Sequence, residues 1–184
     1  MINVTRRQFV VAVGALSTSA CTGGIDRDQG AVIDENVAAA IESMASELPF
    51  TRELINKSSG ILVIPGIHDA SFLFGGAYGE GALLVDLVPV SYYSYTTGSF
   101  GLKLGYQSVT KVFFFLDAES LRRFRGQDGW TLGANLEYAI IDTADTFDIN
   151  SVAHRKSVYS LTVTQSGFLL GASVEGGKFS RIVR

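Results

Sequence analysis

From Gly60 onward the chain consists mainly of short segments rich in aromatic and β-branched residues, separated by Gly, Asp and Ser. Such residues suit pleated strands, and the separating residues favour turns, so the pattern is typical of an antiparallel sheet or barrel. The acidic stretch 142–156 is expected to be a loop. The expected strands cover residues 61–65, 71–86, 91–97, 99–109, 111–116, 130–141, 157–164 and 167–175.

Helices are expected before and within this β region. The first begins at Asp34, a good N-cap residue, and ends at Pro49. A short second helix stops at residues 58–60. A third is capped by Asp117, and its Leu121 and Phe124 face inward. The sequence therefore predicts an α+β fold in which β dominates: a largely antiparallel sheet or barrel with N-terminal helices and one intervening helix.

The first of these helices carries an apolar stripe at helical spacing, which either packs on the core or lies on a membrane. A typical interfacial helix has Lys and Arg on its polar side, whereas this one has Glu42 and Glu47. Core packing is therefore the favoured interpretation. The stripe consists of Val37, Ile41, Met44, Ala45 and Leu48.

The first 20 residues resemble an export signal. Arg6 and Arg7 precede a short apolar run and several small residues, as in a twin-arginine signal, and Cys21, the only cysteine, follows directly. Lipidation of Cys21 is favoured over cleavage that leaves a free thiol. The expected organisation is an export signal of lipoprotein type over 1–20, a flexible tether over 21–33 and one domain over 34–184. The mature protein is expected in the periplasm or at the outer membrane, held by lipid and facing away from the cytoplasm.

Charge limits the range of partners. The full chain has 15 basic and 18 acidic residues, and loss of Arg6 and Arg7 with the signal makes it more acidic. Nucleic-acid binding depends largely on Lys and Arg that neutralise phosphates, so we expect no nucleic-acid partner. Contact with anionic lipid requires a local basic patch.

The motif Gly-Ala-x-x-Glu occurs three times, at residues 76–80, 133–137 and 171–175. Alternation along a strand predicts a sheet with one apolar face and one face of glycine, small polar groups, the three glutamates and Lys103. Lys103 is a candidate partner for the glutamates. The polar face is either solvated or forms a groove in which bare glycine backbone admits a ligand closely.

Six segments of the chain together carry a resemblance to a known family. They are Ser59-Gly60-Ile61-Leu62-Val63-Ile64-Pro65, Phe74-Gly75-Gly76-Ala77-Tyr78-Gly79-Glu80-Gly81, Phe100-Gly101-Leu102-Lys103-Leu104-Gly105, Phe113-Phe114-Phe115-Leu116, Trp130-Thr131-Leu132-Gly133-Ala134 and Gly167-Phe168-Leu169-Leu170-Gly171-Ala172-Ser173-Val174-Glu175-Gly176. In this order they resemble the SYLF domain, and the resemblance covers about residues 36–183.

The resemblance implies a non-enzymatic, phospholipid-binding module of an exported bacterial lipoprotein. Eukaryotic members bind phosphoinositides and, in the yeast branch, actin filaments. Their binding segments near the domain start are basic, whereas residues 34–48 contain no Lys or Arg here. The alternative is a structural or protein-interaction module with an envelope or host partner, actin by family analogy.

Catalytic chemistry finds little support in the residues. His68 and His154 lie far apart, and Cys21 lies in the tether, so we expect neither a catalytic site, nor a metal site, nor a cofactor. The candidate lipid-headgroup contacts are cationic. They are Lys103, Lys111, Arg122, Arg123 and Arg125. The alternative interpretation of the three arginines is that they complement the dipole of their helix and solvate its exposed side.

Overall fold

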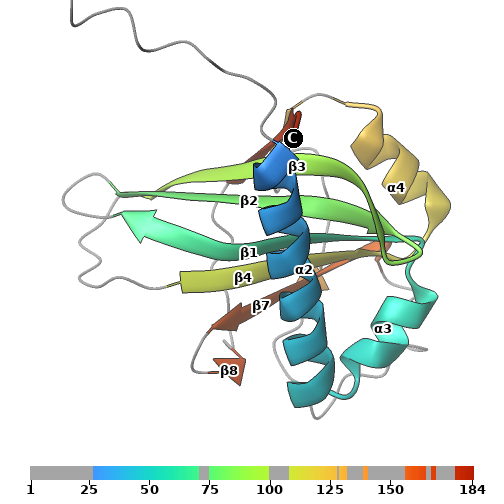
Figure 1. The fold of residues 1–184 in the computed structure, drawn as a ribbon. Coiled ribbons are helices and arrows are strands. Elements are labelled where there is room, and N and C mark those ends of the chain that lie inside the picture. The colour runs from blue at the N-terminus through green and yellow to red at the C-terminus, as the bar shows by residue number, and fades with distance from the viewer. Residues whose placement is uncertain are drawn as a thin grey trace, which may run out of the picture.

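A computed structural model describes residues 27–70, 75–99, 108–127, 129–131, 139–140, 156–164, 167–168 and 177–184. Within these ranges three helices accompany one sheet (Figure 1). The helices are α2 (Arg27–Glu47), α3 (Thr51–Lys57) and α4 (Ala118–Arg125). The longer strands are β1 (Gly60–Ala70), β2 (Gly75–Val85), β3 (Val88–Ser99), β4 (Ser108–Phe115), β7 (Val158–Thr164) and β9 (Gly177–Ile182). The short ones are β5 (Trp130–Thr131), β6 (Ala139–Ile140) and β8 (Gly167–Phe168).

The sheet is antiparallel except where β6 runs parallel to β7. Its strand order is β5-β9-β3-β2-β1-β4-β7-β6, with β8 paired to β7. In the described residues this path has two ends and does not close into a barrel. The predicted β-dominant α+β fold is confirmed in its open-sheet form.

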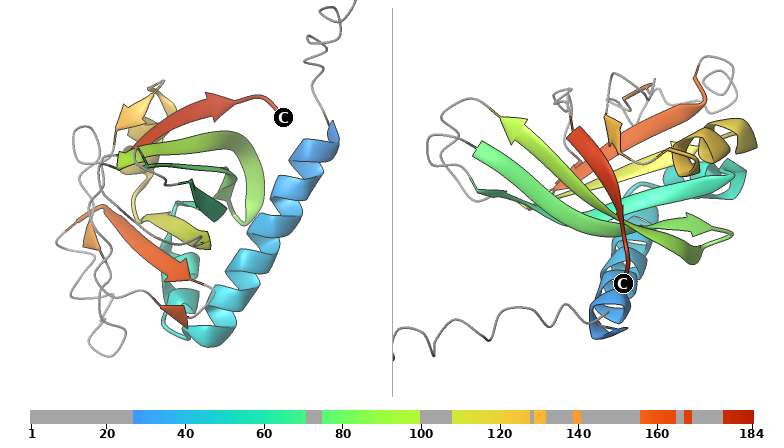
Figure 2. Two further views of the ribbon diagram at one scale, coloured as in Figure 1. Left: turned by 90° about the vertical axis from the view of Figure 1, so that its left-hand side faces the viewer. Right: turned by 90° about the horizontal axis from the view of Figure 1, so that it is seen from above.

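Apolar side chains cover both faces of the central strands. In β1, Leu62 and Ile64 join a cluster that includes α4, whereas Ile61 and Val63 join a cluster that includes α2 and α3. Figure 2 shows α2 running along one side of the curved sheet, with α4 away from it.

The predicted polar face concerned other segments than β1, and of these only residues 76–80 of β2 are described. There Tyr78 is exposed and Glu80 half-buried on one face, while Ala77 on the other face is buried. Farther along β2 the face of Glu80 becomes apolar, because the N-terminal helices cover Ala82 and Leu84.

The first helix begins at Arg27, so the predicted N-cap at Asp34 and the predicted tether over residues 27–33 are wrong. Tertiary contacts hold the extra turns: Gly30 is buried, with Tyr92 Oη and Arg184 Cβ each 3.6 Å from the position that a Cβ of Gly30 would take. Asp34 lies inside α2, and its Oδ2 accepts a hydrogen bond of 3.0 Å from Tyr92 Oη. The apolar stripe packs on the core as predicted, with Val37 and Met44 each 2% exposed.

The other two helices agree with the sequence prediction. The short helix α3 ends at Lys57, directly before residues 58–60. Asp117 caps α4, its side chain accepting a hydrogen bond from the Ser120 backbone N–H, and Leu121 and Phe124 are buried. None of the helices in the described ranges is long and apolar enough to cross a membrane.

The strand boundaries differ from the prediction in several places. β3 covers Val88–Ser99 rather than 91–97, and β4 runs unbroken over Ser108–Phe115, where the prediction ended one strand at 109 and began another at 111. β1 continues past Pro65 to Ala70 because a bulge absorbs the proline, and β9, which was not predicted, adds an edge strand beside β3. Residues 132–138 and 142–155, in the predicted 130–141 strand and the acidic loop, lie outside the described residues. The export signal with Arg6 and Arg7, the acylation site Cys21 and the last two Gly-Ala-x-x-Glu motifs also lie outside them.

Candidate functional site

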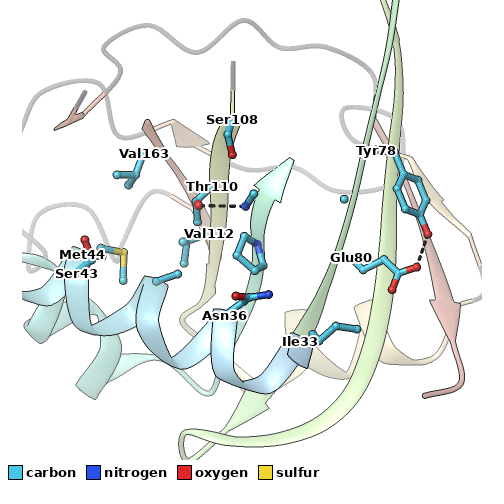
Figure 3. A pocket seen from close by; sticks show the side chains of 14 residues that line it. Ile33, Asn36, Ser43, Met44, Tyr78, Glu80, Ser108, Thr110, Val112 and Val163 are labelled. Carbon is cyan, nitrogen blue, oxygen red and sulfur yellow. Dashed lines mark hydrogen bonds between the residues drawn. The ribbon is translucent and has the colours of Figure 1, made fainter. Parts of the chain in front are cut away.

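A groove of about 580 Å³ separates α2 from the middle of the sheet (Figure 3). Helix α2 forms one wall, and strands β1, β2, β4 and β7 form the floor. Apart from Glu80, its lining combines apolar and neutral polar groups, so it would accept a ligand of mixed polarity. The lining residues are Ile33, Asn36, Ala40, Ser43, Met44, Pro65, Gly66, Tyr78, Gly79, Glu80, Ser108, Thr110, Val112 and Val163.

A β-bulge shapes the floor of this groove. Ile64 pairs with Lys111 and Ile67 with Val109, so Pro65 and Gly66 together oppose a single residue of β4. Proline lacks a donor for the strand ladder, and Gly66 has a φ of 59°, which glycine adopts without strain. The Gly66 N–H donates to Thr110 Oγ1 over 3.4 Å. The sequence Pro-Gly therefore bends β1 beneath α2.

Glu80, at the edge of the groove, forms a cluster with Arg184 and Tyr78. Arg184 donates to both carboxylate oxygens, one bond measuring 3.1 Å from Nε to Oε2, and the Tyr78 hydroxyl donates to Oε1. Burial raises the pKa of Glu80, but the hydrogen bonds from Arg184 and Tyr78 and the Arg184 charge outweigh it and lower that pKa. Burial and the bond to Glu80 raise the pKa of Tyr78. Arg184 is therefore a partner of Glu80, and the predicted partner Lys103 lies outside the described residues.

The described lining residues of the groove form no catalytic arrangement. Of its described lining residues, Glu80 alone is charged, and Arg184 compensates that charge. No three His, Cys, Asp or Glu side chains come together to hold a metal ion in the described part of the chain. His68 lies in β1, where only its backbone is described, and His154 lies outside the described residues.

The structure brings together three of the five predicted headgroup contacts. Arg122, Arg123 and Arg125 lie on the exposed side of α4, opposite the buried Leu121 and Phe124. Arg122 Nε donates to the Ala118 carbonyl oxygen over 3.3 Å, and Arg123 lies 3.6 Å from Glu119. The three arginines thus remain at the surface, anchored by the helix beneath them.

The other two predicted contacts do not join this group in the described structure. Lys111 is half-buried in β4, where its Nζ donates to Tyr95 Oη over 3.2 Å and lies 5.1 Å from the centre of that ring. Lys103 lies outside the described residues. Lys111 therefore stabilises the packing of Tyr95 in this structure.

Further cations reach the same end of the sheet as α4. Gly60 pairs with Phe115, and Phe115 with Val158, so the end of α3, the start of α4 and the start of β7 meet there. Lys57 and Lys156 are both exposed. We call the group Lys57, Arg122, Arg123, Arg125 and Lys156 the basic end.

Lys57 was not predicted as part of this group. It is remote in sequence from α4, and only the pairing of β1 with β4 brings the two helices to one end of the sheet. The local pattern around Lys57 indicates only an ion pair within α3, with Glu53 one helical turn away at 2.8 Å.

Acid is expected to weaken α4 through its cap. Burial raises the pKa of Asp117, but hydrogen bonds from the Ser157 and Ser120 side chains and the Ser120 and Glu119 backbone outweigh it and lower that pKa. A lowered folded-state pKa means that the capping contribution is complete at neutral pH and is lost as pH falls below about 4. Asp117→Ala is expected to cost about 1 kcal/mol at pH 7. The cost should shrink towards pH 2 in urea unfolding; an equal cost at both pH values would contradict this.

The model of the Ysc84 family, described as "Las17-binding protein actin regulator", matches residues 96–182. Residues 96–182 therefore match the Ysc84 domain family. The Ysc84 domain is the SYLF domain, so the family predicted from the sequence is confirmed over that span. No curated protein matches the chain.

The matched span includes β4, α4, β7 and β9, and therefore the three arginines of α4. Helices α2 and α3 and strands β1 and β2 precede it, so the wall of the groove and Lys57 lie outside the match. The Ysc84 family is a family of lipid- or actin-binding modules and not a known enzyme family. The functional class of the family is therefore binding.

Proposed function

We propose that this protein is a non-catalytic phospholipid-binding module of a bacterial envelope lipoprotein, and that it contacts anionic lipid through the basic end. The observation that carries the proposal is the position of Arg122, Arg123 and Arg125, exposed side by side on a helix whose opposite side is buried. Lys57 and Lys156 extend this surface across the same end of the sheet. The match to a family of binding modules supports the same class of function.

The ion pairs already present at the basic end are weak enough for lipid phosphate to replace them. Lys57–Glu53 and Arg123–Glu119 are pairs at 2.8 and 3.6 Å between largely exposed side chains. Exposed pairs of this kind contribute about 0–1 kcal/mol. A Lys or Arg near an anionic membrane gains about 1 kcal/mol. The cations of the basic end can therefore exchange a carboxylate for a phosphate at little cost.

Charge elsewhere on the domain would orient it on the membrane. The outer side of α2 carries exposed acids, among them Glu35, Glu42 and Glu47, which an anionic surface repels. The basic end would face the lipid while α2 points elsewhere. This arrangement reconciles lipid binding with an acidic chain.

The proposed location is the periplasm or the outer membrane, with the protein held by acyl chains on Cys21. The support is the sequence of residues 1–20 and the position of Cys21. The first residue of α2, Arg27, is six positions after Cys21, a distance that the chain spans with about 20 Å at most. An anchor at that distance would keep the domain beside the bilayer and raise its effective concentration there.

Vesicle flotation tests the proposal. The full chain carrying Cys21→Ser, which removes the acyl anchor, should float with vesicles of phosphatidylglycerol and phosphatidylethanolamine and dissociate as salt rises. Arg122→Glu with Arg125→Glu should weaken partitioning by about 30-fold or more, since two cations become anions.

The control is Lys178→Glu with Arg181→Glu, which changes the net charge equally on exposed positions of β9. This double variant should retain most of the binding. Absence of binding to anionic vesicles, or an equal loss in both double variants, would remove the proposed lipid site.

A protein-interaction module is the second candidate function. The family description names binding to the protein Las17 and regulation of actin, which favours a protein partner. An envelope or host protein could occupy the same cationic surface. Stoichiometric recovery of one partner from detergent-free extract, unchanged by added lipid and lost with Arg122→Glu and Arg125→Glu, would support this candidate over phospholipid.

A further inference from the structure

The turn between β2 and β3 exposes apolar side chains. Leu87 is 56% exposed, Val88 59% and Val90 40%, although the same hairpin buries Leu83 and Leu84 almost completely. We call Leu87, Val88 and Val90 the apolar tip. Single exposed apolar residues are normal on protein surfaces, but three within four positions at the end of a hairpin form a local patch.

Leu87 also occupies an unfavourable backbone conformation. Asp86 and Leu87 form a two-residue connection, with φ values of 51° and 62°. Hairpin turns with two positive φ values strongly favour Asn-Gly or Asp-Gly, because a Cβ is strained in this region and a branched apolar side chain gains nothing there. Asp86 fits the turn, whereas Leu87 neither suits the turn nor packs in the core.

The apolar tip projects between the elements that carry the basic end. Leu87 and Asp86 share a surface hollow with Ile55 and Ser58, at the end of α3. On the other side α4 packs over the start of β1, since a Cβ on Gly60 would lie 2.8 Å from Leu121 Cδ1. Figure 1 shows the hairpin turn between α3 and α4.

We propose that the apolar tip inserts into the headgroup region of an anionic bilayer while the basic end binds the surrounding phosphates; this inference rests on the proposed lipid-binding function. Leu87 and Val88 enter the lipid, and the cations around them face its charged surface. Asp86 beside Leu87 limits the depth, because a carboxylate remains hydrated at the interface. The insertion is therefore shallow.

Charge and size favour a membrane over a protein partner for this tip. An anionic bilayer complements a surface on which the cations of the basic end lie on both sides of the apolar tip. A stable protein interface covers about 800 Å² on each partner, far more than three side chains offer. Insertion of one or two side chains suffices for a domain already tethered beside the bilayer.

The decisive variant is Leu87→Asn in the full Cys21→Ser chain. Asparagine tolerates positive φ, so the folded domain should melt at a higher temperature, whereas vesicle partitioning should fall about tenfold with the loss of the leucine side chain from the lipid. The opposite directions of these effects exclude misfolding as their cause. Val183→Asn is the matched control, since Val183 is 71% exposed outside the tip and should change neither quantity.

The outcomes separate this inference from the proposed function. If Cys21→Ser floats with phosphatidylglycerol vesicles but Leu87→Asn floats equally well, insertion is wrong and headgroup binding stands. If the Cys21→Ser chain does not float, both are wrong.

A fluorescent probe supplies a direct readout. The Leu87→Cys variant in the Cys21→Ser background, labelled with a nitrobenzoxadiazole group, should shift its emission to shorter wavelength on phosphatidylglycerol vesicles. An unshifted probe on vesicle-bound protein would overturn insertion. Loss of a co-purifying protein in Leu87→Asn with vesicle binding intact would overturn it as well, and would assign the tip to a protein partner.

Discussion

Replacing Gly81 with alanine is expected to destabilise the domain by about 3 kcal/mol. A Cβ on Gly81 would lie 1.9 Å from the Val63 carbonyl oxygen and 2.8 Å from Ile64 Cα. These are backbone atoms of the neighbouring central strand, so relief requires β1 and β2 to separate. The bulge next to this point, at Pro65 and Gly66, already fixes the path of β1.

Thermal unfolding measures this effect. For a domain of this size 3 kcal/mol corresponds to a fall in Tm of about 6–12 °C. Gly76→Ala in the same strand is the control, because the nearest atom to its Cβ would be Thr97 O at an ordinary contact distance of 3.5 Å. Gly76→Ala should leave Tm nearly unchanged. Equal Tm values for the two variants would contradict the prediction and show that β1 moves to accommodate the added methyl group.

Local signals explain the parts of the fold that the sequence predicted. Asp117 begins a helix because its side chain can satisfy a backbone N–H three residues on, and this requires no knowledge of the rest of the chain. The spacing of Val37 and Met44 identifies the buried side of α2 in the same way. Short segments with turn residues between them likewise indicate an antiparallel sheet.

Contacts between distant segments explain what the sequence did not predict. Helix α2 begins at Arg27 because Gly30 packs against Tyr92 and Arg184, whereas Asp34 gives a misleading local cap signal. The pair Glu80–Arg184 joins residues that are 104 positions apart. No periodicity reports such a pair, because it depends on β9 lying beside β3 and on the C-terminal residues reaching α2.

The candidate site likewise combines residues that a local sequence pattern identifies with residues that only the fold brings together. The arginines of α4 could be selected from the sequence because they follow a recognisable cap in one short helix. Their combination with Lys57 and with the apolar tip could not, because it depends on which ends of β1, β2 and β4 meet. The strain at Leu87 could not be predicted either, because a turn position with a φ of 62° usually holds glycine and not leucine.

Replacing Phe124 with alanine is expected to cost about 3–5 kcal/mol and to release α4 from the sheet. The ring is fully buried, and its centre lies 5.0 Å from those of Tyr93 and Phe115 and 6.0 Å from that of Phe179. With 8 residues, α4 is too short to be stable alone, since isolated helices in water need about 12–15. Its order therefore depends on this ring, on Leu121 and on the Asp117 cap.

Hydrogen exchange distinguishes release of α4 from general destabilisation. In Phe124→Ala the amides of α4 should lose protection to a greater extent than those of β1 and β4, and partitioning onto phosphatidylglycerol vesicles should fall because the arginines no longer share a fixed surface. Phe124→Leu, which keeps an apolar group in the site, should retain most of both properties. If Phe124→Ala leaves α4 protected but abolishes vesicle binding, α4 does not need this ring for its order, and the link between core packing and the basic end is wrong.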